Sequence, residues 1–340
     1  MGWHGLKLVL GGLMVLAAGS GALAQAWSSM TPQVSVGSIE RLDDFVSRYV
    51  DTRPIDVWLP PDYSPAKRYA VLYMQDGQML FDASQTWNKA SWNVHETLSE
   101  LMQQGLVQDT IVVGIPNNGK YRYSEYFPEK YLALAPVDVR EDYVRRAQWG
   151  KTLADDYLRF MVEELKPAID KKYATRPEAA STFLMGSSMG GMISLYALCE
   201  YPHVFGGVAA LSTHWVGRPS AWGAPEKLQN DVLPQAAFTY LRKRLPEPGA
   251  HRIYMDHGTA GLDAIYGRHQ ILVNGIAHEL GYTAAHWQSR VFEGTGHSES
   301  DWAARLHIPL TFLLSIDRST EPLVRITPYC AAACTYPSSP

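Results

Sequence analysis

The stretch Thr182-Phe-Leu-Met-Gly-Ser-Ser-Met-Gly-Gly191 decides the fold class of this chain. It joins a short apolar run, expected to be a strand, to an apolar helical pattern that follows Gly191. Its centre is a Gly-x-Ser-x-Gly pattern with Ser188 in the middle. Between a strand and a helix, this pattern is typical of a nucleophile elbow, a strained turn that lifts the serine hydroxyl off the sheet. The flanking glycines let the backbone pass closely. The context favours a nucleophilic Ser188 over an ordinary Gly/Ser turn.

Short apolar runs alternate with longer helical patterns along the rest of the chain. This alternation is typical of an α/β protein, and uninterrupted apolar runs are typical of strands buried on both faces. The expected strands are residues 56–59, 70–74, 110–115, 182–185, 207–211, 252–255 and 286–292. We therefore expect an α/β fold with a mostly parallel central sheet and helices on both faces.

Three- and four-residue spacing of apolar side chains predicts the helices. One helix is expected to end before Pro167, with its apolar face at Leu153, Tyr157, Phe160, Met161 and Leu165. Another is expected to end at Gly281 as a C-cap, with its apolar face at Leu272, Ile276 and Leu280. Residues 116–150 hold many aromatics and no clean period, so we expect a long functional loop over the C-terminal edge of the sheet.

The composition is that of a folded globular protein. Of the 340 residues, 46% are hydrophobic and 19% are charged, and the net charge of −4 comes without a long run of either sign. These values exclude a disordered or collagen-like chain and predict neither a nucleic acid nor an anionic membrane as partner. We expect one catalytic domain over residues 40–316 and a small-molecule partner.

The two ends of the chain are expected to lie outside this domain. Lys7 and the apolar run Leu8–Leu23 close with Ala22-Leu-Ala24, which favours a secretory signal peptide at residues 1–24 over a membrane anchor. We expect an exported, periplasmic or extracellular protein with an N-terminal extension at 25–39 and a tail at 317–340. Cys330 and Cys334 in that tail either form a local disulfide or stay as free thiols.

A nucleophilic serine needs a base and an acid that orients the base, in the chain order Ser, Asp, His for this kind of turn. His297 is the expected base because it lies in a loop between a strand and the helix start Ser298-Glu-Ser-Asp301. Asp263 is the preferred acid because it lies several residues beyond the strand at 252–255 and can reach over to the histidine. Asp256 is the alternative, although its place at the strand end suits a side-chain bond that holds the Gly258 turn.

Acyl transfer also needs hydrogen-bond donors for the developing oxyanion. The backbone N–H of Met189, directly after the nucleophile, is expected to be one of them. The glycine turn in Gln75-Asp-Gly-Gln78 follows an early strand and could aim the Gln78 N–H at the same point. This chemistry requires neither a metal nor a cofactor, and we expect none.

Three motifs resemble those of the Putative esterase family of α/β-hydrolases, which includes esterase D, enterochelin, feruloyl and mycolyl-transferring enzymes. The motifs are Tyr73–Phe81, Gly186–Gly191, and Gly294-Thr-Gly-His297 with the following Trp302. The resemblance covers roughly residues 40–315. It implies an α/β-hydrolase fold, with Gln78 and Met189 as oxyanion donors and the acid in a segment similar to Gly258–Asp263. Asp263 is spaced further from its glycine than in some members.

The resulting hypothesis is a serine carboxylic-ester hydrolase with Ser188, Asp263 and His297 as its triad. An acyltransferase with the same triad and a binding protein without catalysis on a hydrolase scaffold are the alternatives. A sugar or phenolic ester is the expected substrate if aromatic side chains line the pocket, and otherwise these side chains belong to the core. The aromatic and histidine side chains concerned are Tyr121, Tyr123, Tyr126, Phe127, Tyr131, His214, Trp215 and Trp222.

Overall fold

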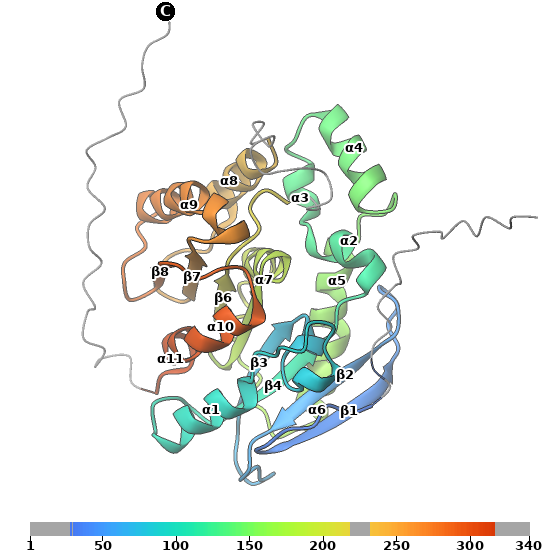
Figure 1. Cartoon of the computed structure of the whole chain (residues 1–340), viewed down its shortest axis with the longest axis vertical. Helices are drawn as coiled ribbons and strands as arrows, with labels where there is room; N and C mark the ends of the chain where they lie inside the picture. The colour runs from blue at the N-terminus through green and yellow to red at the C-terminus, as the bar shows by residue number, and fades with distance from the viewer. Residues whose placement is uncertain (1–27, 29, 218–231, 317–340) are drawn as a thin grey trace, which may run out of the picture.

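One eight-stranded sheet runs through the part of the chain that the computed structural model describes, which is residue 28 and residues 30–217 and 232–316 (Figure 1). The strands are β1 (Ser38–Phe45), β2 (Arg53–Leu59), β3 (Ala70–Gln75), β4 (Thr110–Ile115), β5 (Thr182–Ser187), β6 (Gly207–Leu211), β7 (Arg252–Gly258) and β8 (Trp287–Phe292). All seven predicted strands are present.

The order of the strands is β1-β2-β4-β3-β5-β6-β7-β8. The pairs from β4 through β3 to β8 are parallel, whereas β1 and β2 join the sheet antiparallel. The expected mostly parallel α/β fold is therefore confirmed. Because parallel strands end at the same edge, the segments that follow β3, β5, β6, β7 and β8 all emerge along one side of the sheet.

Helices and short helical turns connect the strands. The α-helices are α1 (Val94–Gln103), α2 (Arg122–Tyr126), α3 (Glu129–Leu132), α4 (Val137–Ala147), α5 (Ala154–Arg159), α6 (Lys166–Lys172), α7 (Met189–Glu200), α8 (Val232–Arg244), α9 (Gly267–Glu279), α10 (Glu299–Arg305) and α11 (His307–Leu314). The shorter turns are η1 (Gly77–Met79), η2 (Ala83–Gln85), η3 (Gly119–Tyr121), η5 (Ala179–Ser181), η8 (Gly261–Ile265) and the π-helical η4 (Phe160–Leu165).

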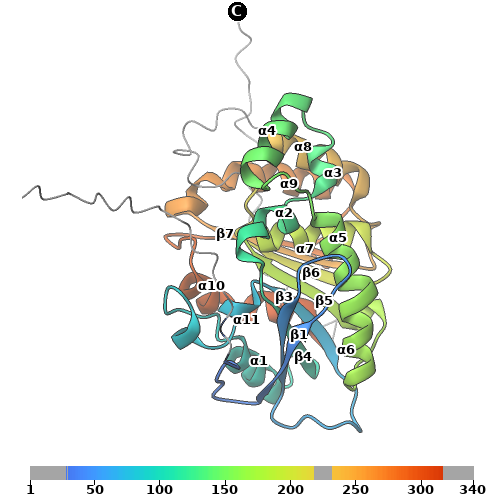
Figure 2. The same cartoon turned by 90° about the vertical axis from the view of Figure 1, so that its right-hand side faces the viewer.

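Alternate residues of the strands point into two separate apolar cores, as the two-residue period of a strand requires. Leu72 and Met185 face the core covered by α1, α10 and α11, whereas Tyr73 and Leu184 face the core covered by α7 and its neighbours. Figures 1 and 2 show α1, α10 and α11 gathered on one face of the sheet, opposite α7.

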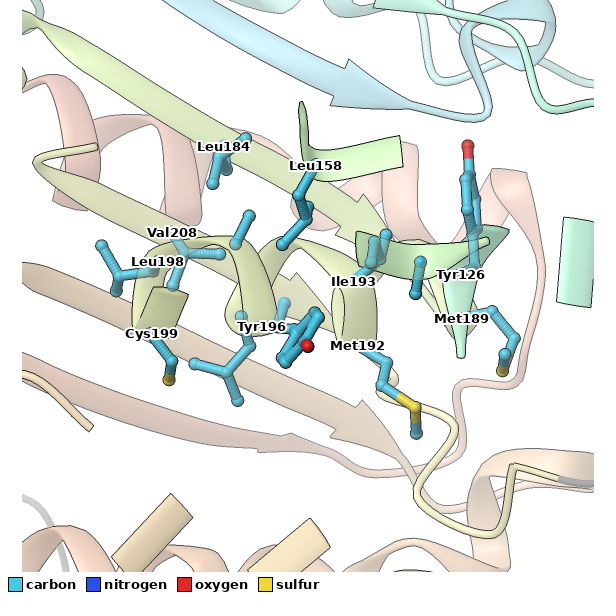
Figure 3. Packing of buried hydrophobic residues seen from close by; sticks show 14 of the residues in the cluster. Tyr126, Leu158, Leu184, Met189, Met192, Ile193, Tyr196, Leu198, Cys199 and Val208 are labelled. Atoms are coloured by element: carbon cyan, nitrogen blue, oxygen red, sulfur yellow. The ribbon is translucent and has the colours of Figure 1, made fainter. Parts of the chain in front are cut away.

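Helix α7 lies at the centre of the larger core and begins directly after Ser188. Every residue from Met189 to Cys199 is buried, so the helix has no solvent-facing side. In Figure 3 its side chains, Ile193 and Tyr196 among them, pack against Leu158 of α5 and Val208 of β6. Such complete burial fixes the position of the turn from which the helix starts.

Two helix predictions need correction. The segment that was expected to end before Pro167 continues through α5, η4 and α6 to Lys172. The wider π-helical turn ends at Leu165, two residues before Pro167, in the turn where the proline ring would clash with a regular helix and remove a hydrogen bond. In α9 the predicted apolar face is confirmed for Ile276, which is buried, but wrong for Leu272 and Leu280, which are 48% and 36% exposed.

The buried face of α9 consists of His269, Gln270, Val273, Ile276 and Ala277. The Gln270 side chain donates to Asn274 Oδ1 at 3.0 Å and its oxygen accepts from Trp215 Nε1 at 3.4 Å. Burial costs little once the polar atoms are satisfied, which is why hydrophobicity alone misplaced this face. The predicted C-cap is confirmed, since Gly281 has a φ of +89°.

Residues 116–150 are not the loop that was expected, since they contain η3, α2, α3 and α4. Of the aromatics that could have lined a pocket, Tyr126, Phe127 and Tyr131 are fully buried core residues, as is Trp215. Tyr121 and Tyr123 remain partly exposed. Trp222, the signal-peptide region and both tail cysteines lie outside the described residues.

No helix within the described ranges has the length and hydropathy needed to cross a membrane.

Candidate active site

Ser188 lies on the sharp turn between β5 and α7. Its backbone angles, φ 56° and ψ −123°, fall in a region that non-glycine residues avoid. The turn is held from several sides: the Ser188 N–H donates to Leu211 O at 2.9 Å, and Ser188 O accepts from the N–H of Met192 and of His214, each at 3.2 Å. Strain maintained by surrounding bonds is the property that the Gly-x-Ser-x-Gly pattern predicted.

The glycines of the elbow are required by close backbone packing. A Cβ on Gly186 would lie 2.6 Å from the carbonyl carbon and oxygen of Gly190. A Cβ on Gly190 would lie 3.0 Å from Gln75 Cβ and 3.1 Å from Asp76 Oδ2. The second pair of contacts brings the turn after β3 against the turn after β5.

Gly186→Ala is expected to destabilise the fold severely, because neither backbone atom that meets the new Cβ can move cheaply. Gly275→Ala is the matched control: Gly275 is an exposed residue of α9 with nothing within 4 Å of its would-be Cβ. This control is expected to gain about 0.5–1 kcal/mol. Melting temperatures of both variants test the prediction, and equal shifts would contradict it.

His297 lies in the loop between β8 and α10, and its ring is held on several sides. Nδ1 lies 2.6 Å from Asp263 Oδ1. The ring packs edge-on against Trp302, with centroids 4.9 Å apart, and against Tyr266 at 5.8 Å. The structure thus brings the preferred acid and the predicted base together.

The loops that carry these two residues are tied to each other. The N–H groups of Thr259 and Ala260 both donate to Thr295 O, at 3.0 and 2.9 Å. After His297, the Ser298 Oγ caps α10 by accepting from the Asp301 N–H at 3.2 Å, so the predicted cap is confirmed. The Asp301 carboxylate also accepts from the Gly296 N–H at 3.1 Å, which fixes the loop on both sides of the histidine.

Asp263 is completely buried, but its carboxylate accepts hydrogen bonds from several groups of the protein. Oδ2 accepts from Ser212 Oγ at 2.6 Å and from the Gly258 N–H at 2.7 Å, in addition to the His297 contact on Oδ1. Burial raises the pKa of Asp263, but these hydrogen bonds outweigh it and hold the pKa below its usual value. The carboxylate therefore stays ionised beside the imidazole.

Asp256, the alternative acid, has a different partner. Its carboxylate forms a bidentate ion pair with Arg305 of α10, at 3.0 and 3.1 Å, and accepts from the Tyr254 hydroxyl at 3.1 Å. Both members of the ion pair are buried. The expectation that Asp256 holds the Gly258 turn is wrong, because Asp263 accepts from that N–H.

The candidate oxyanion turn follows β3. Asp76 adopts a left-handed conformation (φ 53°) immediately before η1, which contains Gln78. The Asp76 carboxylate accepts two hydrogen bonds from Arg122, at 2.7 and 2.8 Å, and one from Asn117 Nδ2 at 2.6 Å. Burial lowers the pKa of Arg122, but the adjacent Asp76 carboxylate outweighs that effect and raises it. The segment 116–150 is thereby fastened to the turn that carries Gln78.

Three residues of this arrangement were not predicted: Ser212, Arg305 and Arg122. Ser212 had one available signal, since it directly follows β6 and so lies at the same sheet edge as the predicted site. No sequence signal points to Arg305 or Arg122, because each binds a distant carboxylate. Arg305 is 49 positions from Asp256, and Arg122 is 46 positions from Asp76.

The chain is similar to a known protein family and to several solved structures. Residues 48–312, most of the chain, match the family described as "Putative esterase". The protein YbbA of Bacillus subtilis (strain 168), described as uncharacterized, is 28% identical over 166 residues, which cover 48% of this chain and 58% of YbbA. The chain spans only 58% and 62% of the length of the two Bacillus subtilis relatives it matches.

Two solved structures are similar at the level of the fold. A ferulic acid esterase of Anaeromyces mucronatus aligns with a TM-score of 0.56 and 19% identity, covering 86% of this chain and 94% of that one. Enterochelin esterase of Shigella flexneri aligns with a TM-score of 0.59 and 17% identity, covering 86% and 61%. The fold is therefore that of α/β-hydrolase-type esterases. With the family match over most of its length, the chain belongs to the Putative esterase family.

Proposed function

We propose that the protein is a serine carboxylic-ester hydrolase that works through an acyl-enzyme. The observation that carries the proposal is the 2.6 Å contact between Asp263 Oδ1 and His297 Nδ1, made at the sheet edge where Ser188 lies on its strained turn. A buried, ionised carboxylate on Nδ1 leaves Nε2 as the nitrogen that can accept a proton from a serine hydroxyl.

The proposed reaction has two halves. Ser188 Oγ attacks the ester carbonyl while His297 Nε2 takes its proton, and His297 then returns that proton to the leaving alcohol. A water molecule, deprotonated by the same nitrogen, then attacks the acyl carbon; the bond to Ser188 Oγ breaks, His297 returns the proton to Oγ, and the acid is released. Asp263 keeps the imidazole in the required tautomer and stabilises the imidazolium.

The backbone N–H groups of Met189 and Gln78 are proposed to stabilise the tetrahedral oxyanion. Met189 is the first residue of α7, and the first N–H groups of a helix have no partner within it. The close approach of Gly190 to Asp76 supports the pairing, because it brings the Gln78 turn against the start of α7. The Arg122 ion pair with Asp76 holds that turn.

The proposed substrate is a small-molecule ester of a phenolic acid or a sugar. Two observations support this class: similar structures are described as ferulic acid and enterochelin esterases, and the partly exposed Tyr121 and Tyr123 flank Arg122, which binds Asp76 in the turn that carries Gln78. Burial raises the pKa of Tyr266, with smaller contributions from Asp263 and Tyr123, and the Tyr266 ring packs against His297. We propose in addition that the enzyme is exported, on the strength of the leader-like residues 1–24.

A fluorophosphonate probe tests the nucleophile directly. We expect the native protein to be labelled on Ser188 and the Ser188→Ala variant to stay unlabelled, because only an activated serine reacts with such probes. Ser187→Ala is the matched control: Ser187 is the buried neighbour in the same motif, and its loss should leave labelling intact. Labelling of Ser188→Ala at the native rate would refute the proposal.

Hydrolysis of feruloyl esters, acetylated sugars, siderophore lactones and p-nitrophenyl acyl esters then ranks the substrate classes. Adding a small alcohol to the same assay measures how the acyl-enzyme is divided between water and the acceptor. Preferential transfer to the alcohol at low acceptor concentration would identify an acyltransferase instead of a hydrolase.

A further inference from the structure

Ser212 occupies an unusual place directly after β6. Its side chain is completely buried, and its backbone has a positive φ of 44°, a conformation that non-glycine residues rarely adopt. Its backbone N–H donates to Asp256 O at 2.8 Å, which anchors the residue to the end of β7. A serine kept in a glycine-like conformation indicates that the hydroxyl group itself is needed there.

The hydroxyl joins three side chains. Ser212 Oγ lies 2.6 Å from Asp263 Oδ2, 2.9 Å from Trp302 Nε1 and 3.1 Å from Arg305 Nη2. An indole N–H and a guanidinium can only donate hydrogen bonds. The Ser212 oxygen therefore accepts from both, and its single proton is directed at the Asp263 carboxylate.

These donor and acceptor roles give the hydrogen-bond network around Ser212 one direction. Arg305, held by its bidentate pair with Asp256, donates to Ser212, which donates to Asp263, whose other oxygen accepts from His297. With the Gly258 N–H also on Oδ2, the Asp263 carboxylate cannot rotate without breaking charge-assisted hydrogen bonds.

We propose that Ser212 is a positioning residue of the esterase site, which orients Asp263 and through it the His297 imidazole, and that Arg305 and Trp302 fix the direction of the Ser212 hydroxyl. The proposal rests on the esterase reaction proposed above. Ser212 is inaccessible to substrate, so its contribution falls on kcat and leaves KM unchanged.

Two variants distinguish the effect of losing the Ser212 hydroxyl from the effect of the backbone strain at this residue. Ser212→Gly removes the hydroxyl and suits the positive φ, whereas Ser212→Ala removes it and keeps the strain. Both are expected to lower kcat about ten- to a hundredfold, the usual value of a hydrogen bond to a charged group, while the glycine variant melts at the higher temperature. Ser99→Ala is the matched control, since Ser99 is buried in α1 and its Oγ has no hydrogen-bond partner among the described residues.

A second measurement distinguishes positioning from a purely structural role. The low-field proton resonance of the Asp263–His297 hydrogen bond is expected to broaden in Ser212→Gly and to stay sharp in Ser99→Ala. Ser212→Cys, which keeps a small side chain with a weaker donor, is expected to give an intermediate kcat.

Native kcat and a sharp resonance in Ser212→Gly would overturn the role of Ser212 and leave the esterase reaction standing. A native enzyme without Ser188-dependent turnover would instead overturn the esterase reaction itself. The two failures are therefore separable.

Discussion

Replacing Ser188 with alanine is expected to lower kcat for an activated ester by about three orders of magnitude or more while the fold stays intact. The variant loses the proposed nucleophile, and the fold is expected to persist because backbone hydrogen bonds hold the Ser188 turn. His297→Ala is expected to cost about as much, since the serine is then left without a base.

The double variant provides the sharper measurement. Members of a triad act as a unit, so Ser188→Ala combined with His297→Ala is expected to lose no more than either single change. Steady-state kinetics and circular dichroism of the three variants check this. Losses that multiply, or turnover retained in purified Ser188→Ala, would contradict the mechanism.

Asp263→Asn and Asp256→Asn are expected to fail in different ways. An amide at position 263 favours the wrong imidazole tautomer and cannot stabilise the imidazolium, so kcat should fall about a hundred- to ten-thousandfold. An amide at position 256 leaves the buried Arg305 guanidinium without its counter-charge. Loss of one partner from a buried ion pair costs about 3–5 kcal/mol, so this variant should lose mainly thermal stability.

Measuring kcat/KM and the melting temperature of both variants separates the two roles. A large rate loss in Asp256→Asn, combined with a kinetically silent Asp263→Asn, would move the acid to Asp256. We do not expect that outcome. Asp263 Oδ1 contacts His297 Nδ1 at 2.6 Å, whereas the Asp256 carboxylate is bound by Arg305 and Tyr254.

The parts of the fold that sequence predicts well are those with a strong local signal. Buried parallel strands are continuous apolar runs, and the elbow combines a strand, two tight glycines and a helix within ten residues. Strand β1 (SIERLDDF) was missed because it lies at the sheet edge, where half-exposed positions carry charges and no apolar run forms. The choice of Asp263 over Asp256 rested on reach along the chain, and the structure places Asp263 beside the histidine.

What sequence could not predict depends on contacts between distant elements. The buried face of α9 is partly polar because Gln270 accepts from Trp215, which lies 55 positions away in the sequence, and donates to Asn274 of the same helix. In the same way, the contacts of Arg305 and Ser212 form only when α10 packs over the ends of β6 and β7. Local propensity holds no information on such pairings.

The segment 116–150 both contributes to the core and holds the turn that carries Gln78. Its Glu125 forms a fully buried ion pair with Arg53 of β2, its Arg122 grips Asp76 beside Gln78, and its aromatics cover α7. Shortening or grafting this segment would uncover apolar surface and release the turn next to the nucleophile at once. Variation of the proposed substrate range is therefore better sought through single side-chain replacements at partly exposed positions such as Tyr121 and Tyr123 than through changes in the length of this segment.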